Sequence, residues 1–155
     1  MTHRSRSDAR LGSLLVALQF VLLAWLVVDG VRGLAAGMAP ADAIAFALAG
    51  FALGVWALSA NRLGNFNIRP TPRAGGRLVQ HGPYRRIRHP MYSALMLAGV
   101  AAARCSTDES TWLVLLALAA VLVVKAGVEE RGMLAQHAAY GEYRRRTWRF
   151  VPWLF

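Results

Sequence analysis

The residues most suited to chemistry lie in two short segments, and the first spans residues 78–92. Within it His89 directly precedes Pro90, a residue type that is favoured at the start of a helix. The free backbone N–H groups of that first turn, together with the guanidinium of Arg88, could bind a carboxylate or a phosphate. The two tyrosines of the segment offer flat faces that suit a purine ring or a cation. The arginines of the segment could instead bind only lipid headgroups.

The second segment is the pair Glu129 and Glu130, which follows the last long apolar run of the chain. Glu129 lies one helical turn after Lys125, so these two side chains share a helix face. A carboxylate there could accept hydrogen bonds from ribose hydroxyls or from an ammonium group. An ionisable residue near membrane depth is a functional candidate by default, although the pair could also be a solvated helix face.

Four apolar segments must position these side chains: residues 11–28, 41–60, 90–103 and 111–128. A bilayer core needs about 20 apolar helical residues. The third segment is shorter, and at 1.5 Å per residue it reaches only about 21 Å. We therefore predict an all-α integral membrane bundle of about four transmembrane helices, with a glycine-rich turn over residues 29–38.

A single domain is expected over residues 1–155, given the length of the chain. Residues 1–60 form two scaffold helices in this interpretation. Residues 61–155 then hold an arginine-rich loop at 61–89, a helical hairpin and a C-terminal helical extension. A loop of that length without secondary structure is uncommon unless it is functional.

The positive charge gathers at one side of these helices. The sequence carries 18 Lys and Arg against 8 Asp and Glu, a formal net charge of +10. All but Arg32 and Arg104 lie near the N-terminus, in the 61–89 loop or from Lys125 onward, so the positive-inside rule predicts cytoplasmic N- and C-termini. Charges that flank apolar segments favour membrane lipids over nucleic acid as partners. The Ala- and Arg-rich composition points to a bacterial inner membrane.

No pattern in the sequence is typical of a metal site. Cys105 is the single cysteine, and the four histidines are not spaced as ligands on one helix face. We therefore expect no metal.

Taken together, the motifs resemble those of a known family. The chain reads Gly-Pro-Tyr-x-x-x-Arg-His-Pro-x-Tyr at residues 82–92, Glu-Glu at 129–130 and Tyr-x-x-Tyr-x5-Arg-Phe-Val-Pro at 140–152. This order is similar to that of the isoprenylcysteine carboxyl methyltransferases and their relatives, the phospholipid N-methyltransferases. The likeness covers about residues 61–152, with a lead-in at residues 65–68. It implies a methyltransferase that is embedded in the membrane and uses S-adenosylmethionine.

In that family the cofactor lies between the Arg-His-Pro loop and the glutamate-bearing helix, so the 61–89 loop becomes a cofactor loop. The resemblance implies contacts to S-adenosylmethionine from residues of both segments. By position these are Leu78, Val79, Tyr84, His89, Pro90, Met91, Tyr92 and Glu129, with Glu130 adjacent.

The methyl acceptor stays open at this point. The family enzyme that acts on prenylated cysteine has an arginine one helical turn before its cofactor glutamate. Here that position is Lys125, which keeps the positive charge but lacks the planar guanidinium of arginine. Lys125 and Arg88 are the candidate substrate contacts. A lipophilic or small acceptor that bears a carboxylate needs no general base. An amine or a thiol needs one, and His89 or Glu130 is then the candidate catalytic residue.

Two other functions remain possible from the sequence. Sterol-reductase-type membrane proteins look similar at this end of the chain, which suggests an NADPH-dependent reductase, but that reading needs a larger site and further helices. The other is a non-enzymatic membrane scaffold that kept the fold, which would bind no cofactor.

Overall fold

The computed structural model describes residues 3–61 and 77–154, and within these ranges the chain is almost entirely helical, without a β-strand. The long helices are α1 (His3–Ala35), α2 (Ala41–Asn61), α3 (Pro90–Cys105) and α4 (Ser110–Gln136). A 3-10 turn, η2 (Gly82–Arg85), precedes α3, and a short helix, α5 (Tyr140–Arg145), follows α4. The expected all-α class is therefore confirmed.

Three helices are long and apolar enough to cross a bilayer, over Arg10–Ala35, Ala41–Asn61 and Ser110–Gln136. Helix α3 has 16 residues, which at 1.5 Å per residue reach about 24 Å, short of the roughly 30 Å hydrocarbon core. Large apolar side chains face outward on α1 and α2, such as Trp25 at 53% and Phe51 at 73% exposure. The membrane bundle thus has three candidate spanning helices, and α3 is its short member.

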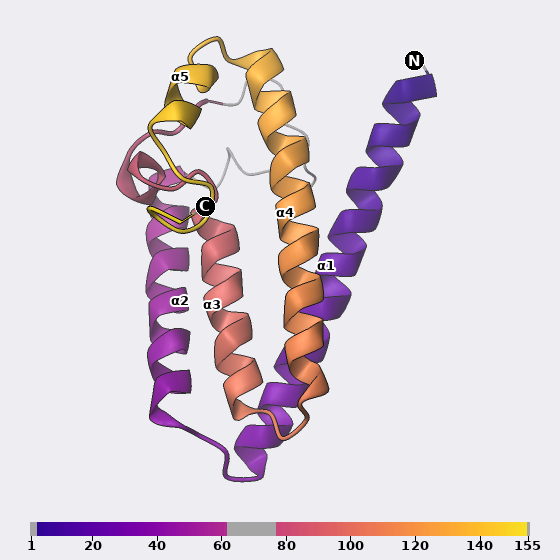
Figure 1. Ribbon diagram of the computed structural model, residues 1–155, viewed down its shortest axis with the longest axis vertical. Coiled ribbons are helices and arrows are strands. Elements are labelled where there is room, and N and C mark those ends of the chain that lie inside the picture. The colour runs from indigo at the N-terminus through magenta and orange to yellow at the C-terminus, as the bar shows by residue number, and fades with distance from the viewer. Residues whose placement is uncertain (1–2, 62–76, 155) are drawn as a thin grey trace.

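The long helices run up and down, so that their ends meet in two groups (Figure 1). The N-terminus, the end of α2, the start of α3 and the end of α4 lie at one end, with α5 beside them. The turns that join α1 to α2 and α3 to α4 lie at the opposite end. This arrangement brings the segment before α3 and the polar end of α4 to the same end of the bundle.

Helix α1 is longer than its apolar segment predicts. It continues to Ala35, whereas we expected a turn over residues 29–38, and the chain leaves the helix only at residues 36–40. The charged Asp29 stays in the helix because its carboxylate accepts hydrogen bonds from the hydroxyls of Ser106 and Thr111. The expected turn was wrong because these partners come from the connection between α3 and α4, far along the chain.

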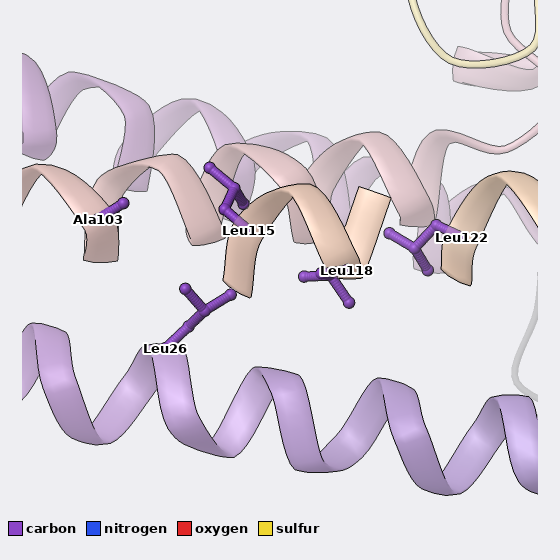
Figure 2. Packing of buried hydrophobic residues seen from close by; sticks show 5 residues of the cluster. All are labelled: Leu26, Ala103, Leu115, Leu118 and Leu122. Carbon is purple, nitrogen blue, oxygen red and sulfur yellow. The ribbon is translucent and has the colours of Figure 1, made fainter. Parts of the chain in front are cut away.

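Small residues let the helices approach closely, as expected for membrane helices. A Cβ on Gly33 of α1 would lie 1.7 Å from the carbonyl oxygen of Cys105 at the end of α3. A Cβ on Gly50 of α2 would lie 3.0 Å from the carbonyl oxygen of Ala94 in α3. A buried cluster between α1, α3 and α4 completes the packing (Figure 2): Leu26, Ala103, Leu115, Leu118 and Leu122. These contacts hold α3 in place, and with it the side chains at its start.

Candidate functional site

The backbone before α3 is fixed by the C-terminal segment of the chain. The N–H of Arg88 donates to the carbonyl of Trp148 at 2.8 Å. The N–H of His89 donates to the carbonyl of Arg149 at 3.0 Å. Next along α3, the hydroxyl of Ser93 donates to the carbonyl of Phe150 at 2.7 Å. The Arg-His-Pro motif and the C-terminal Arg-Phe-Val-Pro motif therefore form one structural unit.

Glu130 is the buried anion of this unit, with a side chain that is only 3% exposed. Its Oε1 lies 2.9 Å from Nε of Arg88 and 3.3 Å from Nε2 of His89. Arg149 donates to both oxygens, from Nε at 3.1 Å and from Nη2 at 3.0 Å. A buried carboxylate needs such partners to offset its lost hydration, and the three basic side chains supply them.

Arg88 is bound by the protein's own oxygen atoms. Besides its bond to Glu130, its Nη1 donates to the carbonyl of Arg144 at 3.2 Å and to the carbonyl of Thr147. Its side chain is 9% exposed. Arg88, which the sequence predicts as a substrate contact, therefore joins α4 to the C-terminal segment.

Glu129 differs from its neighbour, because its side chain is 23% exposed. It accepts a hydrogen bond from the hydroxyl of Tyr92 on α3. Its Oε2 lies 3.4 Å from Nδ1 of His89. Three residues that the sequence places in two distant segments therefore meet, and the Glu129 carboxylate stays partly exposed.

His89 lies between the two glutamates, with Nδ1 near Glu129 and Nε2 near Glu130. Burial disfavours the charged imidazolium, but the hydrogen bonds and negative charges of the two carboxylates outweigh it. The net effect raises the pKa of His89 above its ordinary value of 6.5. Both ring nitrogens face an acceptor, so this geometry suits a protonated imidazolium that donates two hydrogen bonds.

Aromatic rings and one lysine lie beside these carboxylates. The His89 and Tyr92 rings stack at 5.4 Å with an interplanar angle of 3°, and Phe150 contacts His89 edge-on at 5.8 Å. Nζ of Lys125 lies 5.2 Å from the centre of the Tyr92 ring and donates to Oε1 of Gln19 at 2.5 Å. The contribution of Gln19 from α1 was missed, and the signal for it was a polar residue inside an apolar run.

The remaining predicted cofactor contacts lie along the same stretch of chain. Tyr84 is buried in η2, where its carbonyl accepts a hydrogen bond from the Tyr143 hydroxyl at 2.7 Å. Burial raises the pKa of the Tyr84 phenol to about 12. Four other residues are buried or half-buried before η2 or in the first turn of α3: Leu78, Val79, Pro90 and Met91. The lead-in at residues 65–68 lies outside the described residues.

The donor set of the site suits a cationic ligand that also carries hydroxyl groups. Glu129 offers a part-exposed carboxylate, and Tyr92 and Phe150 offer aromatic faces beside it. Within residues 3–61 and 77–154, no three His, Cys, Asp or Glu side chains are grouped so that they could hold a metal ion. The groups that the site offers to a ligand are therefore the carboxylate of Glu129 and the aromatic rings of Tyr92 and Phe150.

Comparison with known proteins identifies a family. A family model described as phospholipid methyltransferase matches residues 42–141, which is well over half of the chain. The matched region runs from α2 to the start of α5 and includes both His89 and Glu129. No curated protein matches the sequence.

Proposed function

Because the chain belongs to the phospholipid methyltransferase family, we propose that this membrane enzyme transfers a methyl group from S-adenosylmethionine to a lipophilic or small acceptor. The site faces the cytoplasm, with both termini on that side of a bacterial inner membrane. Residues 1–60 are the scaffold, and residues 61–155 carry the cofactor loop and the site. The observation that carries the proposal is the meeting of His89, Tyr92 and Glu129 around a part-exposed carboxylate.

The residues of this group fit the chemistry of S-adenosylmethionine. The carboxylate of Glu129 can accept hydrogen bonds from ribose hydroxyls or from the amino acid ammonium. The rings of Tyr92 and Phe150 suit the sulfonium charge. The other cofactor contacts in this proposal are Leu78, Val79, Tyr84, His89, Pro90 and Met91, with Glu130 next to them.

When bound, S-adenosylmethionine supplies a methyl group that is transferred by in-line displacement from sulfur. The protein's own contribution to such a step is orientation and exclusion of water. Glu130 holds His89 through the ion pair at 3.3 Å, and His89 in turn holds the Glu129 carboxylate. His89 and Glu130 thus orient the Glu129 carboxylate, which contacts the cofactor in this proposal.

Lys125 supports an acceptor that bears a carboxylate. Its side chain is 2% exposed, and the described residues place no carboxylate within ion-pair distance of its Nζ. A carboxylate acceptor could accept a hydrogen bond from Nζ of Lys125, and it would need no general base. An amine or thiol acceptor would need one, and both ring nitrogens of His89 already face carboxylates.

Cofactor binding tests the proposal directly. S-adenosylmethionine and NADPH are titrated separately into the full-length protein in detergent micelles, and binding is measured by calorimetry. We expect the wild type to bind S-adenosylmethionine and Glu129→Ala to bind it at least about tenfold more weakly, since a hydrogen bond to a charged group is lost. Glu142→Ala is the matched control, because the Glu142 side chain is 69% exposed on α5. Binding of NADPH alone would favour a reductase, and binding of neither would favour a scaffold.

A matched set of acceptors tests the choice of a carboxylate. Palmitic acid, hexadecylamine and hexadecanethiol have the same chain and differ in the reacting group. With radiolabelled S-adenosylmethionine, we expect label transfer to the acid, and a loss of that transfer in Lys125→Met. Transfer to the amine or the thiol alone would refute the carboxylate assignment while leaving the methyltransferase proposal intact.

A further inference from the structure

A pocket of about 410 Å³ lies between α2, η2 and the C-terminal segment, and its lining includes none of the site residues described above. We propose that it binds the phosphate-bearing headgroup of an anionic phospholipid, which acts as a structural ligand and not as the methyl acceptor. Its walls are largely apolar: Leu53, Trp56, Pro83, Ile87 and Pro152. This inference does not rest on the proposed methyl transfer.

The cationic lining of the pocket consists of Arg85 and Arg86. Both side chains are exposed, and neither has an ion pair with a carboxylate in the described parts of the chain. They differ in this from Arg88 and Arg149, which share the buried carboxylate of Glu130. Two guanidinium groups without an ion-pair partner among the described residues, next to an apolar wall, match a phosphate that is attached to an apolar molecule.

The position of the pocket favours a lipid over a soluble phosphate. Trp56 lines the pocket near the end of α2, and this helix ends at Asn61. Tryptophan is enriched at the headgroup level of membranes, and the Trp56 side chain is 54% exposed. About two helical turns before Trp56 on the same helix, Leu48 is 64% exposed. A phospholipid can therefore place its phosphate at the arginines and its acyl chains along α2.

The pocket is built by a close contact that needs glycine. Gly82 begins η2 with a φ of 59°, and a Cβ there would lie 2.8 Å from Cβ of Ala60 and 3.3 Å from Nε1 of Trp56. The turn can therefore rest directly on α2. On its other side, the carbonyl of Arg86 accepts a hydrogen bond from the N–H of Trp148 at 3.0 Å. A lipid in the pocket thus joins α2 to the backbone that leads into the candidate active site.

Lipid retention tests this inference without any assay of activity. The full-length protein is purified in detergent and incubated with phosphatidylglycerol or phosphatidylcholine, and bound lipid is measured by native mass spectrometry. We expect the wild type to retain phosphatidylglycerol in preference to phosphatidylcholine. The double variant Arg85→Gln/Arg86→Gln should retain at least about tenfold less, because two charged hydrogen-bond donors are lost. Arg144→Gln/Arg145→Gln is the matched control, since it removes two adjacent exposed arginines from α5.

Several outcomes would overturn the inference. Equal losses in the two double variants would mean that surface charge alone attracts the lipid. Equal retention of the two lipids would show that the pocket does not select an anionic phospholipid. Inorganic phosphate that raises the unfolding temperature as much as phosphatidylglycerol does would show that the phospholipid is not the ligand. Trp56→Leu provides a second variant that keeps both arginines and shortens the pocket wall. If both pocket variants keep their helical circular dichroism and retain phosphatidylglycerol as the wild type does, the pocket is not a lipid site.

Discussion

At the residue scale, the two neighbouring glutamates of α4 have opposite surroundings. Glu130 is 3% exposed and contacts Arg88, His89 and Arg149, whereas Glu129 is 23% exposed. The sequence predicts a functional pair of carboxylates. It does not tell which of them is buried, because that depends on basic residues 19 to 42 positions away along the chain. In the proposed function, Glu130 therefore acts through His89, and Glu129 is the carboxylate that contacts the ligand.

A first prediction separates these two roles by stability. Glu130→Gln removes the negative charge that three buried or half-buried basic side chains share, so we expect a loss of roughly 3 kcal/mol or more in the free energy of unfolding. Glu142→Gln breaks one exposed pair with a separation of 3.8 Å, and it should cost less than about 0.5 kcal/mol. Unfolding in mixed micelles of SDS and a mild detergent measures both. A Glu130 variant as stable as its control would contradict the structural role.

A second prediction concerns pH and follows from His89. Its pKa is raised above 6.5 in the folded protein by the two carboxylates, so folding favours the protonated form. The stabilisation is therefore fully present below about pH 6.5, the pKa of an unfolded histidine. It is lost as the pH rises through the higher, folded-state pKa.

We expect the unfolding temperature of the wild type to fall as the pH is raised from about 6 to 9. In His89→Gln this fall should be smaller, because the variant has no titrating group between the two carboxylates. Differential scanning fluorimetry over a pH series measures both curves. Parallel curves for the two proteins would show that His89 does not titrate in this range.

At the element scale, the apolar segments predict the four long helices well, and the main error is the end of α1. Residues 41–60 and 90–103 match α2 and α3 within two residues. Helix α1 continues to Ala35, whereas the glycines of residues 29–38 predicted a turn there. The hydroxyl partners that hold Asp29 in the helix come together only when α3 and α4 are folded. A local pattern holds no information about that contact.

The crossing of α1 and α3 gives a third prediction. A Cβ on Gly33 would lie 1.7 Å from a backbone oxygen of Cys105, so Gly33→Ala must move the two helices apart, at a cost of about 1–3 kcal/mol. Gly127 of α4 is the matched control, because a Cβ there meets only the end of the Arg131 side chain at 3.8 Å. We expect Gly127→Ala to be neutral or to stabilise by up to about 1 kcal/mol. Unfolding in mixed micelles compares the two, and equal stabilities would argue against this close crossing.

At the scale of the whole molecule, the ends of the helices sort the polar residues into two layers. The candidate site lies at the end that also holds the N-terminus and α5 (Figure 1). The opposite end carries a separate polar group, in which Arg104 pairs with Asp42 at 2.7 Å. This sorting agrees with the charge count, which assigns the arginine-rich end to the cytoplasm. Helix α3, with 16 residues, is shorter than the bilayer core, as the length of its apolar segment predicts.

The fourth prediction tests that orientation. Single cysteines are introduced at Glu109, which is exposed in the turn before α4, and at Arg145, which is exposed on α5. The background carries Cys105→Ala, which removes the one native cysteine. In intact bacterial cells, a membrane-impermeant maleimide should label the Glu109→Cys protein and leave the Arg145→Cys protein unlabelled until the inner membrane is opened. This result is expected because the positive-inside rule retains the arginine-rich end in the cytoplasm. The reverse pattern would place the site on the outer face, where cytoplasmic S-adenosylmethionine could not reach it, and would refute the orientation on which the proposed reaction depends.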